Sequence, residues 1–173
     1  MHAHTAPLPI HCVHAETPGP ASPATAPELL RLGLDRVLAD PARFGARFYA
    51  RLFDLLPEAR ALFPSELEAQ QHKLVQALAL LVRSLDRGES VEPLLRQLGQ
   101  RHRHYGAEPA HYAVVGQALI DSLEACGERS LGPAVRAAWG RLYAWVAATM
   151  LEGAAERGPA STRPEAEPAS GGP

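Results

Sequence analysis

Proline placement constrains this chain of 173 residues more than any other feature, because proline suits the first turn of a helix and breaks its interior. Six of the 16 prolines lie in residues 1–27 and four in residues 158–173, and both ends are also rich in Ala, Ser, Thr or Gly. Such ends bury too little apolar surface to offset the entropy of ordering. We therefore predict a disordered tail over 1–27, a folded domain over 28–157 and a disordered tail over 158–173.

The other six prolines mark the places where helices begin or end. They stand between segments whose apolar residues recur at helical spacing, and Asp40 followed by Pro41 is typical of a cap and a first helical residue. No strand-like alternation and no internal repeat is apparent. The sequence predicts an all-α domain of about seven helices, at residues 27–39, 41–56, 57–63 (a short turn), 66–86, 91–104, 109–126 and 131–156.

Composition argues against several classes of function. The formal net charge is −2 and Lys73 is the only lysine, so the chain has no electrostatic footprint for nucleic acid. No run approaches 18 consecutive apolar residues, and the N-terminus does not resemble a secretion signal, so no membrane association and a cytoplasmic location are expected. Cys12 and Cys126 suggest no disulfide framework. Phosphate-binding glycine loops, HExxH and GxSxG are absent from the sequence.

The N-terminal tail carries His2, His4, His11, Cys12 and His14. These residue types bind metals, but their spacing matches no structural zinc pattern. We therefore favour a tail without a metal site and keep metal binding as the alternative.

The stretch "RHRHYG" separates two histidines by helix geometry. Val91, Leu95, Leu98 and His102 are spaced 4, 3 and 4 apart, so they share one face of the predicted helix. His104 is rotated by about 200° from His102 and points away from the core. Only His102 can serve an internal site, although a single inward histidine is more often a hydrogen-bonded structural residue.

Two further polar residues lie on apolar faces. Gln70 lies within a stripe of leucines in helix 66–86, and Tyr49 shares a face with leucines in helix 41–56. Each alone has an ordinary structural explanation. Together with His102, they suggest a flat apolar cofactor with a nitrogen ligand on one side and two hydrogen-bond donors on the other. No CxxCH motif is present, so a haem would be held non-covalently.

The chain resembles the globins, and specifically the bacterial single-domain haemoglobins related to the globin part of flavohaemoglobins. The resemblance covers about residues 28–152 and is carried by "FYARLFDLLPEARALF", "QQHKLV", "LGQRHRHYGAEPAHYAVVGQAL" and "AAWGRLYAWVAATM". The separations between these motifs also match those of the family. The resemblance implies a globin fold around a pocket for haem b and its iron.

On the distal side of the haem, the resemblance assigns four residues. Tyr49 and Gln70 match the distal tyrosine and glutamine, which would donate hydrogen bonds to a gas on the iron, each contributing about 1–3 kcal/mol. Phe63 matches the phenylalanine that packs on the porphyrin, and Leu74 matches the apolar residue that covers the iron. Lys73 lies to the side of the same helix and is a candidate for the haem propionates, with an ordinary solvated lysine as the equal alternative.

On the proximal side, His102 matches the axial ligand of the iron. Leu98 lies one turn before it on the same face and is expected to contact the cofactor. Tyr112 matches the tyrosine that hydrogen-bonds near the proximal histidine.

The sequence departs from the flavohaemoglobin pattern at one proximal position. Flavohaemoglobins place a glutamate in the last helix, where it completes a His–Tyr–Glu network, and the corresponding residue here is Ala154. Glu152 and Glu156 lie two residues to either side and face elsewhere on a helix. The departure weakens the expected anionic push on the histidine.

The resemblance implies a protein that binds O2 tightly, with NO and CO as further ligands, and that works as a monomer or weak dimer. Two hydrogen-bond donors favour oxygen retention, so we expect nitric oxide dioxygenation, with a separate electron-donating reductase. A non-enzymatic protein for oxygen storage, transport or scavenging is the alternative, and a haem-based gas sensor is a third interpretation. Whether the chain is an enzyme is therefore left open by the sequence.

Overall fold

The fold comes from a computed structural model that describes residues 27–127 and 130–156. The described residues form six α-helices and one short 3₁₀ helix, with no strand among them. In chain order these are α1 (Pro27–Ala39), α2 (Pro41–Leu55), η2 (Pro57–Leu62), α3 (Glu68–Asp86), α4 (Glu92–His104), α5 (Pro109–Ala125) and α6 (Pro133–Ala155). The predicted all-α fold of seven helices is confirmed, with bounds displaced by at most two residues. No helix in these ranges is long and apolar enough to span a bilayer.

Local signals in the sequence set the ends of the helices. The Asp40 carboxylate accepts a hydrogen bond of 3.0 Å from the backbone N–H of Arg43, which is the predicted cap of α2. Gly88 and Gly106 follow α3 and α4 with φ of 68° and 90°, a conformation that other residues rarely adopt. A proline lies in the first turn of each of five helices, α2, η2, α4, α5 and α6: Pro41, Pro57, Pro93, Pro109 and Pro133.

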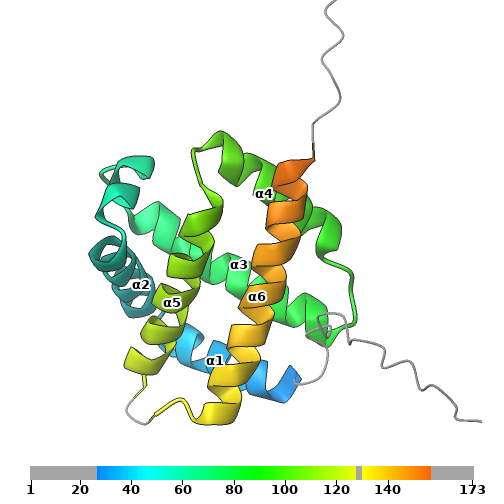
Figure 1. The fold of residues 1–173 in the computed structure, drawn as a ribbon. Coiled ribbons are helices and arrows are strands. Elements are labelled where there is room, and N and C mark those ends of the chain that lie inside the picture. Colours follow the sequence, from blue (N-terminus) through cyan, green and yellow to red (C-terminus); the bar gives the residue numbers. More distant parts are fainter. Residues whose placement is uncertain (1–26, 128–129, 157–173) are drawn as a thin grey trace, which may run out of the picture.

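The helices cross in two layers around a single main core. Figure 1 shows α5 and α6 running beside each other, with α3 passing behind them and α1 below. Trp139 of α6 is fully buried at the centre of this core. Its indole lies against Gly33 of α1, where a Cβ atom would be only 2.0 Å from Nε1. The glycine therefore lets α1 approach α6 closely.

The contact of α4 with α6 is closer still. A Cβ atom on Gly99 of α4 would be 1.8 Å from the carbonyl oxygen of Met150, and one on Gly153 of α6 would be 2.2 Å from the carbonyl oxygen of Arg96. The two backbones are thus in direct contact on both sides of the crossing. A smaller apolar cluster of Val91, Leu95 and Met150 fills the space beside it.

Candidate functional site

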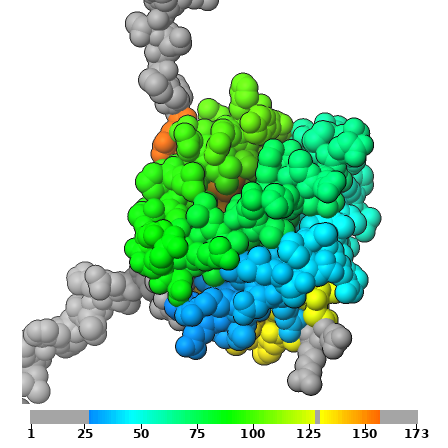
Figure 2. Space-filling model, turned by 180° about the vertical axis from the view of Figure 1, so that it is seen from behind, coloured from blue at the N-terminus to red at the C-terminus, as the bar shows by residue number. Residues whose placement is uncertain are grey.

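An apolar cavity of about 190 Å³ lies between α3 and α4. Figure 2 shows a hollow on the face formed by the green segments, with part of α6 visible at its bottom. The predicted cofactor contacts Leu74 and Leu98 line the cavity from α3 and α4. Sequence reasoning missed the contributions of the other helices, which include Phe48, Val115, Leu119, Tyr143 and Val146.

His102 lies in the last turn of α4 and is half-buried, whereas His104 is exposed, as the spacing predicted. The ring nitrogen Nδ1 of His102 is 2.9 Å from the carbonyl oxygen of Leu98, one turn earlier. Because a carbonyl can only accept, Nδ1 carries the proton and Nε2 keeps a lone pair. Burial lowers the pKa of His102 below its usual 6.5, so the ring is neutral near pH 7. A neutral imidazole with a lone pair on Nε2 is the form that binds iron.

Tyr49 and Gln70 are brought together by the packing of α2 on α3. The Tyr49 side chain is buried, and its hydroxyl donates to the backbone carbonyl of Gln70 over 3.4 Å. Burial raises the pKa of Tyr49 to about 12, so the hydroxyl keeps its proton at neutral pH. The Gln70 side chain is half-buried. At neutral pH the Tyr49 hydroxyl and the Gln70 amide can therefore both donate hydrogen bonds, and their distal role stays a prediction.

Phe63 packs against Tyr49 in an aromatic cluster at the corner between η2 and α3. Its ring centroid lies 5.3 Å from that of Tyr49 and 5.7 Å from that of Phe53, both in edge-on arrangements. Arg60 holds this corner, because its guanidinium donates to the carbonyl oxygens of residues 63, 64 and 65 over 2.9 to 3.2 Å. The guanidinium carbon also lies 5.4 Å from the Phe53 ring centroid. No pattern in the sequence indicates this role of Arg60, because its partners are backbone carbonyls.

Lys73 and Tyr112 make no contact in the described residues that corresponds to their predicted roles. Lys73 is exposed on α3 and makes no ion pair within the described residues. Tyr112 is half-buried, and its backbone carbonyl accepts a hydrogen bond of 2.5 Å from the Tyr143 hydroxyl. In the described part of the chain, the ring of His102 bonds to the Leu98 carbonyl and not to Tyr112. A propionate contact for Lys73 and a proximal role for Tyr112 stay predictions.

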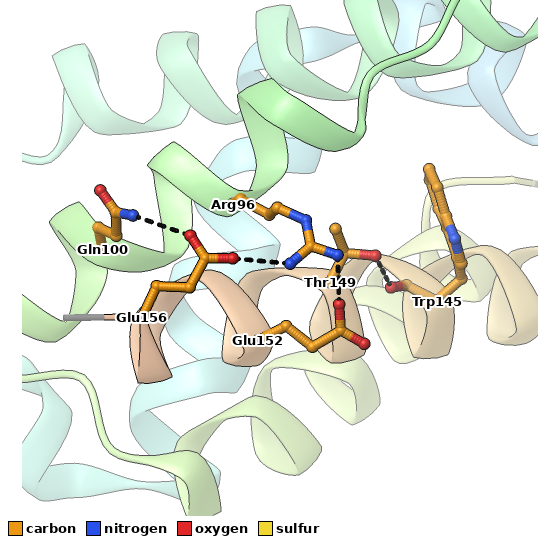
Figure 3. A network of polar contacts seen from close by, with 6 residues as sticks. All are labelled: Arg96, Gln100, Trp145, Thr149, Glu152 and Glu156. Carbon is orange, nitrogen blue, oxygen red and sulfur yellow. Dashed lines mark hydrogen bonds and ion pairs between the residues drawn. The ribbon is translucent and has the colours of Figure 1, made fainter. Parts of the chain in front are cut away.

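The residues that line the cavity have the apolar character that a haem needs. The cavity of about 190 Å³ is smaller than most cofactor sites, and its lining includes none of His102, Tyr49 and Gln70. A flat apolar macrocycle needs an apolar slot, and here α3 and α4 each supply leucines to one. An axial nitrogen ligand needs a second hydrogen bond that fixes its tautomer, and the Leu98 carbonyl provides it. The carbonyl oxygen of Ala154 accepts a hydrogen bond from Arg103, and Glu152 and Glu156 bind Arg96 (Figure 3). Both carboxylates are thus engaged away from His102.

The chain is similar to known proteins in sequence and in fold. The profile of the globin family matches residues 46–150, more than half of the chain. Neuroglobin from Tetraodon nigroviridis is 30% identical over 145 residues, which cover 76% of this chain and 91% of that protein. A flavohemoprotein of Bacillus subtilis is 28% identical over 104 residues, which cover 58% of this chain and 26% of that protein.

A solved structure is also similar. It is an engineered carbene transferase made from a nitric oxide dioxygenase candidate of Rhodothermus marinus. The TM-score is 0.66 with 25% sequence identity, and the match covers 75% of this chain and 91% of that chain. Its helices therefore follow much the same path as those described above.

Proposed function

This chain belongs to the globin family, and from that premise we propose that it binds haem b non-covalently between α3 and α4, binds O2, and converts nitric oxide to nitrate with electrons from a separate reductase. The observation that carries the proposal is the neutral imidazole of His102 on α4, whose tautomer is fixed by the Leu98 carbonyl. The buried Tyr49 hydroxyl beside the backbone of Gln70 supports it. The apolar cavity between α3 and α4 supports it, because Leu74 and Leu98 line that cavity one turn from Gln70 and His102.

When bound, haem supplies an iron atom that takes up a diatomic gas and changes oxidation state. The nitrogen Nε2 of His102 would hold the iron, and the Leu98 carbonyl orients the ring. Leucines of the cavity exclude water, which strengthens every hydrogen bond made inside it. The protein therefore supplies one ligand, a dry slot and its own donors.

Tyr49 is the donor best suited to the distal role. Its O–H···O distance of 3.4 Å to the Gln70 carbonyl is well beyond the usual range for hydroxyl donors, so that bond is weak. The Tyr49 hydroxyl can therefore donate its hydrogen bond to a stronger acceptor instead, because little free energy is lost when the bond to the Gln70 carbonyl breaks. A bond from Tyr49 to partly negative oxygen contributes about 1–3 kcal/mol and slows oxygen release accordingly.

The overall conversion combines O2, NO and one electron to give nitrate. Rapid mixing of the reduced, oxygen-saturated protein with NO tests it directly. We expect one nitrate for each chain and a ferric absorption spectrum at the end, which a reductase then reverses. Release of O2 without nitrate would refute the enzymatic function and leave a haem protein for oxygen storage or transport.

One observation favours that second function. The proximal histidine has a carbonyl as its hydrogen-bond partner, and the two carboxylates at the end of α6 bind Arg96 instead. A carbonyl makes the imidazole less basic than a carboxylate does, which gives less electron push onto the iron. Oxygen storage needs no such push.

The haem ligand itself is tested by a matched pair of variants. We expect His102→Ala to lose tight haem binding and the Soret band of the wild type. His104→Ala, an exposed residue two positions away, should keep both. Equal haem binding by the two variants would show that His102 is not the ligand.

A further inference from the structure

Helix α4 is supported on one face and borders a cavity on the other. Leu94, Leu95 and Leu98 of α4 line the cavity, so part of this face borders open space, while Leu95 also packs in the buried cluster with Val91 and Met150. The extensive packing of α4 is with α6. Because α4 carries His102, the contact with α6 decides where the imidazole lies before anything enters the cavity.

Two ion pairs of one arginine join α4 to the C-terminal end of α6. The guanidinium of Arg96 donates to Glu152 over 2.7 Å and to Glu156 over 2.8 Å (Figure 3). The amide of Gln100, one turn further along α4, lies 3.5 Å from the second carboxyl oxygen of Glu156. We call Arg96, Glu152 and Glu156 the Arg96 clamp. Two charge-assisted bonds from one planar group fix direction as well as distance.

Two further contacts hold α4 against α6 beyond the Arg96 clamp. Gly99 and Gly153 let the backbones touch, so a small rotation of α4 cannot be absorbed by flexible side chains. In the last turn, Arg103, next to His102, donates to the carbonyl oxygen of Ala154. The polar bonds are thus made by residues six positions before His102 and immediately after it.

We propose that Arg96 is a positioning residue: the Arg96 clamp holds α4 folded against α6 while the cavity contains no cofactor, and so presents His102 ready to bind. The clamp uses the carboxylates of Glu152 and Glu156, which lie on either side of Ala154. Ala154 is the position at which the flavohaemoglobin pattern has a glutamate that interacts with the proximal histidine. In this chain the charge at the end of α6 acts on the helix that carries the ligand instead of on the ligand. The part of this proposal that concerns haem rests on the proposed function, whereas the part that concerns α4 does not.

Hydrogen exchange of the full chain before haem is added tests the part that concerns α4. We expect Arg96→Ala to speed exchange of the amides of residues 95–104 by about fivefold, while the amides of α1 and α2 keep their rates. Arg31→Ala is the matched control, because it removes an exposed ion pair of 3.1 Å with Asp86, which joins α1 to α3. It should leave α4 exchange unchanged.

A double-mutant cycle separates the clamp from general destabilisation. The variant Glu152→Gln with Glu156→Gln keeps the shape of α6 and should speed α4 exchange as Arg96→Ala does. Adding Arg96→Ala to it should then change little, because the interaction is already gone. Additive effects, or equal acceleration in α1 and α2, would overturn the proposal even if haem binds normally.

The haem-loaded chain supplies the second readout. We expect Arg96→Ala to raise the rate of haem transfer to an excess of a competing apo-globin several-fold and to broaden the iron–histidine stretching band in the ferrous form, with Arg96→Lys between the variant and the wild type. An unchanged band and rate would overturn positioning of the ligand. If the wild type takes up no haem, the proposed function fails, while the exchange experiment still decides whether the clamp holds α4.

Discussion

Replacing Gly99 with alanine tests the backbone contact between α4 and α6. The new methyl carbon would lie 1.8 Å from the carbonyl oxygen of Met150 and 2.6 Å from its carbon. Both atoms belong to a helix backbone, so neither can move aside as a side chain does. The helices would have to separate by about 1.5 Å to reach an ordinary van der Waals distance.

The expected loss of stability follows from two opposing effects. Alanine is favoured over glycine inside a helix by about 1 kcal/mol, which stabilises the variant. Overpacking against rigid neighbours costs about 1–3 kcal/mol, and a backbone partner places this site at the upper end. We therefore expect Gly99→Ala to lower the free energy of unfolding by about 1–2 kcal/mol.

Gly140 provides a control with the same chemistry and the opposite sign. It lies inside α6, and apart from its chain neighbours and the backbone of α6 itself, no atom would lie within 4 Å of its Cβ. Gly140→Ala should therefore raise the free energy of unfolding by about 0.5–1 kcal/mol. Urea denaturation followed by circular dichroism measures both variants in the full chain. If Gly99→Ala stabilises the chain as much as Gly140→Ala does, the two helices are not in contact at Gly99.

Three further predictions concern the distal side. Tyr49→Phe should speed oxygen release by about tenfold or more in stopped-flow measurements, whereas Tyr105→Phe, which removes an exposed hydroxyl, should not change it. Equal release rates in the two variants would show that Tyr49 does not bond to the bound oxygen. Arg60→Ala should lower the free energy of unfolding by about 1–2 kcal/mol and broaden the NMR signals of the Phe63 ring, with only partial recovery in Arg60→Lys, because an ammonium cannot bond three carbonyls as a planar fork does; an unaltered ring signal would contradict this role. Because burial raises the pKa of Tyr49 from 10 to about 12, its contribution to stability is complete below pH 10 and is lost as the pH rises through 12; Tyr49→Phe should lack that part of the alkaline loss, as a pH series of urea denaturations would show.

The helices could be predicted closely because their ends depend on neighbouring residues. A proline, the capping carboxylate of Asp40 and the glycines after α3 and α4 act within one turn of the chain, so their effect is visible in the sequence itself. The inward face of His102 follows from spacing for the same reason. Residues 1–26, 128–129 and 157–173 lie outside the described residues, so the predicted tails stay predictions.

The helix-to-helix contacts could not be predicted in this way. Periodicity treats each helix alone. The resemblance supplied Leu74 and helix spacing supplied Leu98, but neither indicated Phe48 or Tyr143, which reach the same cavity from α2 and α6. An arginine on a helix carries no sign of which carboxylate, 56 or 60 residues later, will bind it. Gly99 gave no signal either, because the reason for its lack of a side chain lies on another helix.

The position of the clamp has a consequence for protein engineering. Helix α4 depends on Glu152 and Glu156, which form the last turn of α6 and its end. An electron-donating domain fused after residue 148 would remove that turn, and α4 would lose its partner although no residue of the cavity had been altered. A fusion that begins after residue 156 would keep it. The safe junction for such a chimera is therefore fixed by a helix that lies some fifty residues earlier in the chain.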